Sequence, residues 1–281
     1  MLRVIKKIYH LIIALNKTIR LKLTKELKNK IRATYFRVNF LEIYDSKHKI
    51  ANIVRFKVKF YTYEELAYLF NEIFINQEYY FISKTNSPYI IDCGSNIGMS
   101  ILYFKMLYPD SSILAFEPSE EVFSCLESNI RNNNLNSIIV NKIALSNKEG
   151  AIYFYYDKDN LDSLVSSIKQ ERMPKQKRTV EASVLSKYID RDVDFLKMDV
   201  EGAELEIIEE LSNKGKLNYV KQMVIEYHHH IVRDSDIFSK LLRLLEDAGF
   251  GYQIESHLQR PLISKQFQDI LIYAYQKNST T

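Results

Sequence analysis

The 281-residue chain contains no tryptophan, two cysteines, five prolines and seven glycines. The two cysteines, Cys93 in a predicted buried strand and Cys125 in a predicted helix, make neither a disulfide framework nor a zinc site, so we expect a reduced, cytoplasmic setting. The scarcity of glycine and proline excludes a collagen-like or linker-dominated chain. Tyrosine (20), phenylalanine (15) and a hydrophobic share of 46% instead predict a packed core.

A long apolar run is also missing near the N-terminus. The stretch Leu11–Leu15 is too short to cross a bilayer, and His10 together with the lack of a small-x-small cleavage site argues against a signal peptide. Apolar residues instead recur at helical spacing opposite Lys6, Lys17 and Arg20, which predicts an amphipathic basic helix. These apolar residues are Ile5, Ile8, Ile12, Leu15 and Ile19.

Positive charge is concentrated in the same region. Residues 1–60 hold 16 Lys and Arg against three acids, whereas the rest of the chain holds 23 against 32. A basic arm on an acidic body favours an anionic partner such as lipid headgroups, and a solvated helix is the alternative. We therefore predict peripheral membrane contact through residues 1–35, or packing of this helix on the domain or on a second subunit of a homo-oligomer.

The chain divides at a polar stretch near residue 85. Residues 1–85 form a predicted basic extension with a strand over Ile53–Tyr61 and a helix over Glu64–Tyr80. Residues 86–281 alternate strands and helices, which predicts an α/β domain with a mostly parallel sheet, helices on both faces and a closing antiparallel hairpin. The main strands are predicted over Tyr89–Cys93, Ile113–Phe116, Ile138–Ile143, Asp194–Met198, Val220–Tyr227, Phe250–Glu255 and Ile270–Tyr275.

A glycine-containing loop, Asp92–Gly98, follows the first of these strands and leads into a helix. Such a loop presents backbone N–H groups to a ligand at the place where open α/β sheets bind their ligands. Asn96 stands where a dinucleotide-binding loop has its second glycine, so a nicotinamide cofactor is disfavoured. Glu117 ends the second strand, 19 residues after Gly98, and could accept both hydroxyls of a ribose. A plain turn and a surface carboxylate are the structural alternatives.

Acidic residues also follow the strand that ends at Met198. Asp199 could orient the ammonium group of a ligand or an acceptor hydroxyl, and Glu201 could act as a general base. Glu204 and Glu206 are expected to be ordinary first-turn acids of the following helix.

Histidines end a later strand. Alternation predicts that Glu226, His228 and His230 share one face. Three interpretations stay open: His228 as a general base or substrate contact, histidines that merely pack at a strand end, and a divalent-metal site of Asp199, Glu226 and His228. The metal site has the weakest support from the sequence, so no metal is expected.

Four segments, taken in order, resemble the FkbM-type methyltransferases over about residues 88–230. They are Ile91–Gly98, Phe116–Pro118, Ala144–Ser146 and Lys197–Glu204. The resemblance implies a class I Rossmann-like sheet of seven strands, S-adenosylmethionine (SAM) as methyl donor, and an oxygen acceptor on a sugar or polyketide-type product. The cofactor contacts that it implies are Asp92, Gly94, Ser95, Asn96, Gly98, Ser100, Glu117, Pro118, Ala144 and Asp199. Cys93, Ser95 and Ser186 depart from the residues usual in the family.

These observations together predict a SAM-dependent O-methyltransferase acting on a hydroxyl of a sugar, glycan or related natural product. Asp199, Glu201, Glu226 and His228 are its catalytic candidates. No Asn/Asp-Pro-Pro-aromatic segment follows the fourth strand, so no nucleic-acid substrate is expected. Two alternatives stay open: an NAD(P)-dependent oxidoreductase on a Rossmann-like sheet, and a non-catalytic nucleotide- or lipid-binding module.

Overall fold

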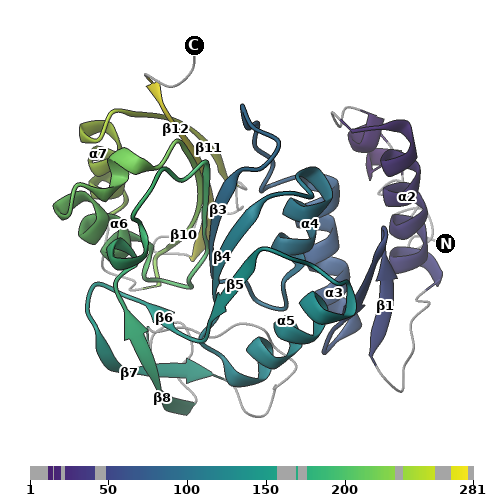
Figure 1. Ribbon diagram of the computed structural model, residues 1–281, viewed down its shortest axis with the longest axis horizontal. Coiled ribbons are helices and arrows are strands. Elements are labelled where there is room, and N and C mark those ends of the chain that lie inside the picture. The colour runs from purple at the N-terminus through teal and green to yellow at the C-terminus, as the bar shows by residue number, and fades with distance from the viewer. Residues whose placement is uncertain are drawn as a thin grey trace.

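A seven-stranded sheet, in the order β11-β12-β10-β9-β3-β4-β5, forms the centre of the computed structural model (Figure 1). The structure describes residues 12–14, 16–19, 23–41, 49–156, 169, 176–231, 237–256 and 267–277. Only β12 runs antiparallel within the sheet, so the predicted closing hairpin is confirmed. The strands are β3 Tyr89–Cys93, β4 Ser112–Phe116, β5 Ile138–Asn141, β9 Phe195–Met198, β10 Gln222–His229, β11 Phe250–Ser256 and β12 Gln268–Gln276.

Helices cover both faces of this sheet, as the alternating pattern predicts. Helices α4 (Met99–Leu107) and α5 (Glu120–Asn132) lie on one side, and α6 (Glu204–Asn213) and α7 (Phe238–Asp247) lie on the other (Figure 1). The chain passes from β3 outward to β4 and β5, and returns to the other side of β3 at β9. Ligands of open α/β sheets bind at the carboxyl ends of strands beside such a reversal, here between β3 and β9.

A small second sheet, of order β6-β8-β7, lies below the large one in Figure 1. Its strands are β6 Ala144–Leu145, β7 Gly150–Tyr156 and β8 Gln176–Ser183. Short 3-10 turns follow at Leu185–Tyr188 and Lys216–Tyr219. Residues 157–168 and 170–175, which belong to the irregular region expected from the sequence, lie outside the described residues.

The elements before β3, which include α3 (Tyr63–Phe70), pack against α4 and α5. They are helix α2 (Lys25–Phe36), strands β1 (Ile50–Ile53) and β2 (Phe56–Lys59), and the π-helical turn η2 (Asn71–Asn76). Their buried side chains belong to the same hydrophobic cluster as α4, which explains why nearly every residue of α4 is buried. A domain boundary near residue 85 stays a prediction, because residues on both sides of it share one core.

Two predictions for this region were wrong. The single strand expected over Ile53–Tyr61 is a hairpin whose turn includes Val54, at φ 56°. Ile53 is out of phase with Phe56 and Val58 in the sequence, and the turn brings all three to the buried side. The helix expected over Glu64–Tyr80 widens into η2 and ends at Gln77, whose φ is 60°.

The predicted amphipathic helix of residues 1–35 is described only in part, because Ile5, Ile8 and Leu15 lie outside the described residues. Ala14 and Thr18 face the body of the protein, whereas the side chains of Ile12 and Ile19 are 53% and 60% exposed. Contact of this apolar side with a membrane or a second subunit stays a prediction. Among the helices that the structure describes, none is long and apolar enough to cross a membrane.

Candidate active site

The glycine loop joins the carboxyl ends of β3, β4 and β9. Gly94 has φ 79°, and its N–H donates to the carbonyl of Phe116 at 3.0 Å. A Cβ added at Gly94 would lie 1.7 Å from the carbonyl oxygen of Asp199, so only glycine lets the ends of β3 and β9 approach this closely. The loop therefore places Asp199 beside Gly94, at the start of the glycine loop that is predicted to bind the cofactor.

Four of the predicted cofactor residues stabilise the conformation of this loop. Asp92 is fully buried and accepts a 2.6 Å hydrogen bond from the hydroxyl of Ser100. The hydroxyl of Ser95 donates to the carbonyl of Asp92 at 3.0 Å. Gly98 has φ 90° and precedes α4, and a Cβ there would lie 2.7 Å from Leu126 Cδ1. Their described contacts are with the protein itself.

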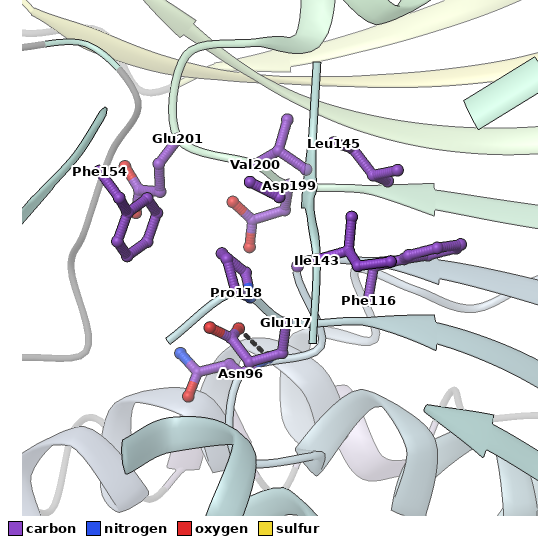
Figure 2. A pocket seen from close by; sticks show the side chains of 12 residues that line it. Asn96, Phe116, Glu117, Pro118, Ile143, Leu145, Phe154, Asp199, Val200 and Glu201 are labelled. Atoms are coloured by element: carbon purple, nitrogen blue, oxygen red, sulfur yellow. Dashed lines mark hydrogen bonds between the residues drawn. The ribbon is translucent and has the colours of Figure 1, made fainter. Parts of the chain in front are cut away.

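The other six predicted cofactor residues line one cavity (Figure 2). The empty space between its walls, which includes the mouth that opens to solvent, is about 580 Å³. It is lined by Gly94, Asn96, Phe116, Glu117, Pro118, Ile143, Ala144, Leu145, Phe154, Asp199, Val200 and Glu201. Figure 2 shows Glu117 and Asn96 at one end, Asp199 across from them, and Glu201 beside Phe154.

Glu117 is buried at one end of this cavity. Its two carboxylate oxygens accept backbone hydrogen bonds from Asn96 at 3.0 Å and from Ser119 at 2.9 Å. Burial raises the pKa of Glu117 to about 7, although these two bonds and the ammonium of Lys197 act in the opposite direction. A carboxylate held in this way keeps free lone pairs for hydroxyl groups in the cavity.

Lys197 is a site residue that the sequence reasoning did not single out. It lies inside β9, is 2% exposed, and places its Nζ 3.6 Å from Asp92 Oδ1 and 3.4 Å from Asp199 Oδ2. Nζ also donates to the carbonyls of Cys93 and Gly94. Burial lowers the pKa of Lys197, but the two aspartates outweigh burial and raise it to about 12. A charged residue inside an apolar strand was the available signal.

His228 lies at the end of β10 among carboxylates. Its Nδ1 is 2.9 Å from Glu204 Oε1, and its Nε2 is 3.3 Å from Glu201 Oε2 and 3.8 Å from Asp199 Oδ1. Burial lowers the pKa of His228, but Glu204 and Glu201 raise it well above its usual value of 6.5.

Glu204 corrects one interpretation made from the sequence. It lies in the first turn of α6, as predicted, but it is 1% exposed and has a further role. Its Oε1 accepts from the backbone N–H groups of Gly202 at 2.9 Å and Val200 at 3.3 Å and also faces His228. The sequence reasoning missed this role because the two side chains are separated by 24 residues and meet only in the folded chain.

Glu226 also comes close to this group, as strand alternation predicts. One ligand atom from each of Asp199, Glu226 and His228 lies within 4.8 Å of the others. Burial and the neighbouring Asp199 carboxylate raise the pKa of Glu226 to about 8. The alternation does not continue to His230, because β10 ends at His229 and His230 turns away with φ 62°.

Three features define a class I Rossmann-like methyltransferase. They are the strand order, the single antiparallel strand of the sheet, and a carboxylate, Glu117, that follows β4 beside a glycine loop. The profile described as the Methyltransferase FkbM domain matches residues 92–252, more than half of the chain. The chain belongs to the FkbM methyltransferase family. This membership removes the oxidoreductase alternative.

Two curated relatives carry the same activity in their names. The chain is 29% identical to Methyltransferase 1 of Beauveria bassiana over 212 residues, which covers 68% of this chain and 83% of the relative. It is 28% identical to Methyltransferase sdnD of Sordaria araneosa over 220 residues, which covers 66% of this chain and 82% of the relative.

Solved structures also resemble this chain. Methyltransferase FkbM from Methylobacillus flagellatus KT matches at 16% identity with a TM-score of 0.44. The match covers 94% of this chain, which spans only 58% of that structure's length.

Proposed function

We propose that this methyltransferase uses SAM to methylate a hydroxyl group of a sugar, glycan or related natural product. The observation that carries the proposal is a single cavity with Glu117 at one end and the carboxylates of Asp199 and Glu201 at the other. The two ends suit two different reactants, a nucleoside at Glu117 and a polar acceptor beyond Asp199.

The residues of the cavity fit SAM. A buried carboxylate whose two oxygens are already fixed by Asn96 and Ser119 can accept hydrogen bonds from ribose hydroxyls without reorganising. The apolar side chains of Ile143, Leu145 and Phe154 offer a surface for a flat base. Bound SAM supplies an electrophilic methyl group on a positively charged sulfonium, and a carboxylate such as Asp199 stabilises positive charge nearby.

The chain's own residues must orient the acceptor and take its proton, because methyl transfer from sulfur to oxygen releases one proton. Glu201 lines the cavity and stands 3.3 Å from His228 Nε2, so it is our proposed proton acceptor. His228 lies against Glu201 at the wall of the cavity, and Asp199 is placed to orient the acceptor hydroxyl. This division uses three of the four catalytic candidates and needs no covalent enzyme intermediate.

The charge of this region narrows the acceptor class. Asp199, Glu201 and Asp269 approach His228, and Lys197 is already engaged by Asp92 and Asp199. An anionic acceptor such as a phosphorylated sugar would meet like charge here. A neutral polyol or an amino sugar fits better.

The proposal is tested by incubating the full chain with methyl-labelled SAM and fractions of cell-envelope glycan, lipid and RNA. We expect label in a hydroxyl-bearing glycan or natural product, released as a methyl ether after hydrolysis. Label only in RNA, or SAM binding with no transfer to any fraction, would contradict the proposal; the second result favours the non-catalytic alternative.

A further inference from the structure

Three donor side chains converge beyond the methyl-transfer cavity. Asp199 follows β9, while Glu226 and His228 project from the end of the neighbouring β10. One donor atom of each lies within 4.8 Å of the other two. Asp199 belongs both to this group and to the lining of the cavity, so the group borders the proposed acceptor position.

His228 is the most constrained member of the group. Its side chain is 2% exposed, and Nδ1 is held by the buried Glu204 at 2.9 Å. Nε2 lies 3.3 to 3.9 Å from three carboxylate oxygens. These belong to Glu201 at 3.3 Å, Asp199 at 3.8 Å and Asp269 at 3.9 Å.

These separations match those of donors that share one ion. Two donor atoms that each lie about 2.0–2.2 Å from a cation are about 3 Å apart when they are at right angles and about 4.3 Å apart when they are opposite. The 3.8 Å between His228 Nε2 and Asp199 Oδ1, two of the proposed donors, falls inside this window. Direct hydrogen bonds would instead bring the atoms to about 2.7–2.9 Å.

The surroundings prepare the donors in two further ways. A carboxylate on Nδ1 fixes the ring orientation and leaves Nε2 as the donor atom, which is the usual support of a metal-bound histidine. Asp199 directs Oδ2 towards the Lys197 ammonium, 3.4 Å away, and Oδ1 towards His228. One oxygen of Asp199 is therefore left for an ion on the His228 side.

We propose that Asp199, Glu226 and His228 bind one divalent cation of the Mg²⁺ or Mn²⁺ type, next to the acceptor end of the methyl-transfer cavity. Carboxylate oxygens with one imidazole nitrogen suit a hard or borderline divalent ion, with Glu201 and Asp269 close enough to complete its charge balance. The ion would contact the acceptor oxygen and favour its deprotonated form. This role rests on the proposed function, whereas the binding site itself does not.

The test is direct titration of the full, chelator-treated chain with Mn²⁺, followed by the loss of the free-ion signal in electron paramagnetic resonance. We expect one Mn²⁺ per chain with a Kd below about 1 mM. Spin-echo modulation from imidazole nitrogen should be visible on the bound ion. Glu226→Gln should weaken binding by at least about 10-fold, and His228→Gln should abolish the nitrogen modulation.

Glu127→Gln is the matched control, because it removes one carboxylate from the exposed side of α5 and should leave Mn²⁺ binding unchanged. Thermal melting of each variant shows whether it is folded. Absence of Mn²⁺ binding, equal binding by the folded Glu226→Gln variant, or bound Mn²⁺ without nitrogen modulation would each overturn the proposal. If methyl transfer survives chelation, the role of the ion in deprotonating the acceptor fails while the proposed function stands. If Mn²⁺ binds but no hydroxyl is methylated, the metal site stands and the proposed function fails.

Discussion

Glu117→Gln should make the ligand-free protein more stable at alkaline pH while weakening its binding of SAM. The folded chain holds the proton of Glu117 up to about pH 7, whereas the unfolded chain releases it near 4.5. Between these values the folded state binds more protons, so the free energy of unfolding falls as pH rises, and the full cost is present above pH 7.

The magnitude follows from the two pKa values. Moving the pKa of one carboxyl from 4.5 to about 7 costs the folded state about 3 kcal/mol, at about 1.36 kcal/mol per pH unit. Glutamine does not ionise, so the variant lacks this cost. It does bring an NH₂ group against a backbone N–H of Asn96 or Ser119, which costs about 1–3 kcal/mol at every pH.

The assay is urea unfolding of both proteins at several pH values between about 4.5 and 8, because the pH-independent loss cancels from the comparison. The stability difference should shift in favour of Glu117→Gln by about 3 kcal/mol across this range. Glu127→Gln, at an exposed site on α5, is the control and should run parallel to the parent. Parallel curves for Glu117→Gln as well would refute the claim that burial governs the ionisation of Glu117.

Two further changes test the contacts behind the site. Gly94→Ala should lower the free energy of unfolding by more than about 3 kcal/mol, because the new Cβ would lie 1.7 Å from the Asp199 carbonyl oxygen and φ is positive. Gly150→Ala is the control, since Gly150 also has a positive φ but no atom within 4 Å of the added Cβ, and it should cost only about 1–2 kcal/mol. Equal losses in a melting experiment on the two variants would contradict the close approach at Gly94. Glu204→Gln should cost about 3 kcal/mol near neutral pH by leaving His228 without its buried partner. The contribution of the Glu204–His228 pair to the free energy of unfolding should fall at both ends of the pH range. The pKa of Glu204 is lowered, so its part is lost as pH falls below 4.5; the pKa of His228 is raised, so its part is lost as pH rises above 6.5. A destabilisation by Glu204→Gln that does not vary with pH would speak against the ion pair.

The parallel sheet could be predicted because its strands are short, buried and separated by helical segments. Strand β3 was placed at the residues where the structure has it. The joint position of Glu117 and Asp199 also follows from the sequence, since parallel strands direct their carboxyl ends to one edge.

The rest depends on contacts between residues far apart in the chain. Lys197 reaches the carbonyl of Cys93 across 104 positions, and no local pattern announces such a bond. Glu204 has the sequence context of a helix-start acid, and only burial against His228 changes its role. In the β1–β2 turn, the backbone N–H of Val54 donates a hydrogen bond to the Thr34 hydroxyl on α2. Strand periodicity does not encode this contact.

The most direct test of the account is calorimetric titration of the parent chain, Glu117→Ala and His228→Ala with SAM and with NAD. We expect the parent to bind SAM and not NAD, Glu117→Ala to lose SAM binding, and His228→Ala to keep SAM binding but lose methyl transfer. Binding of NAD by the parent, or equal loss of SAM binding in both variants, would contradict a cofactor end at Glu117 and an acceptor end at His228.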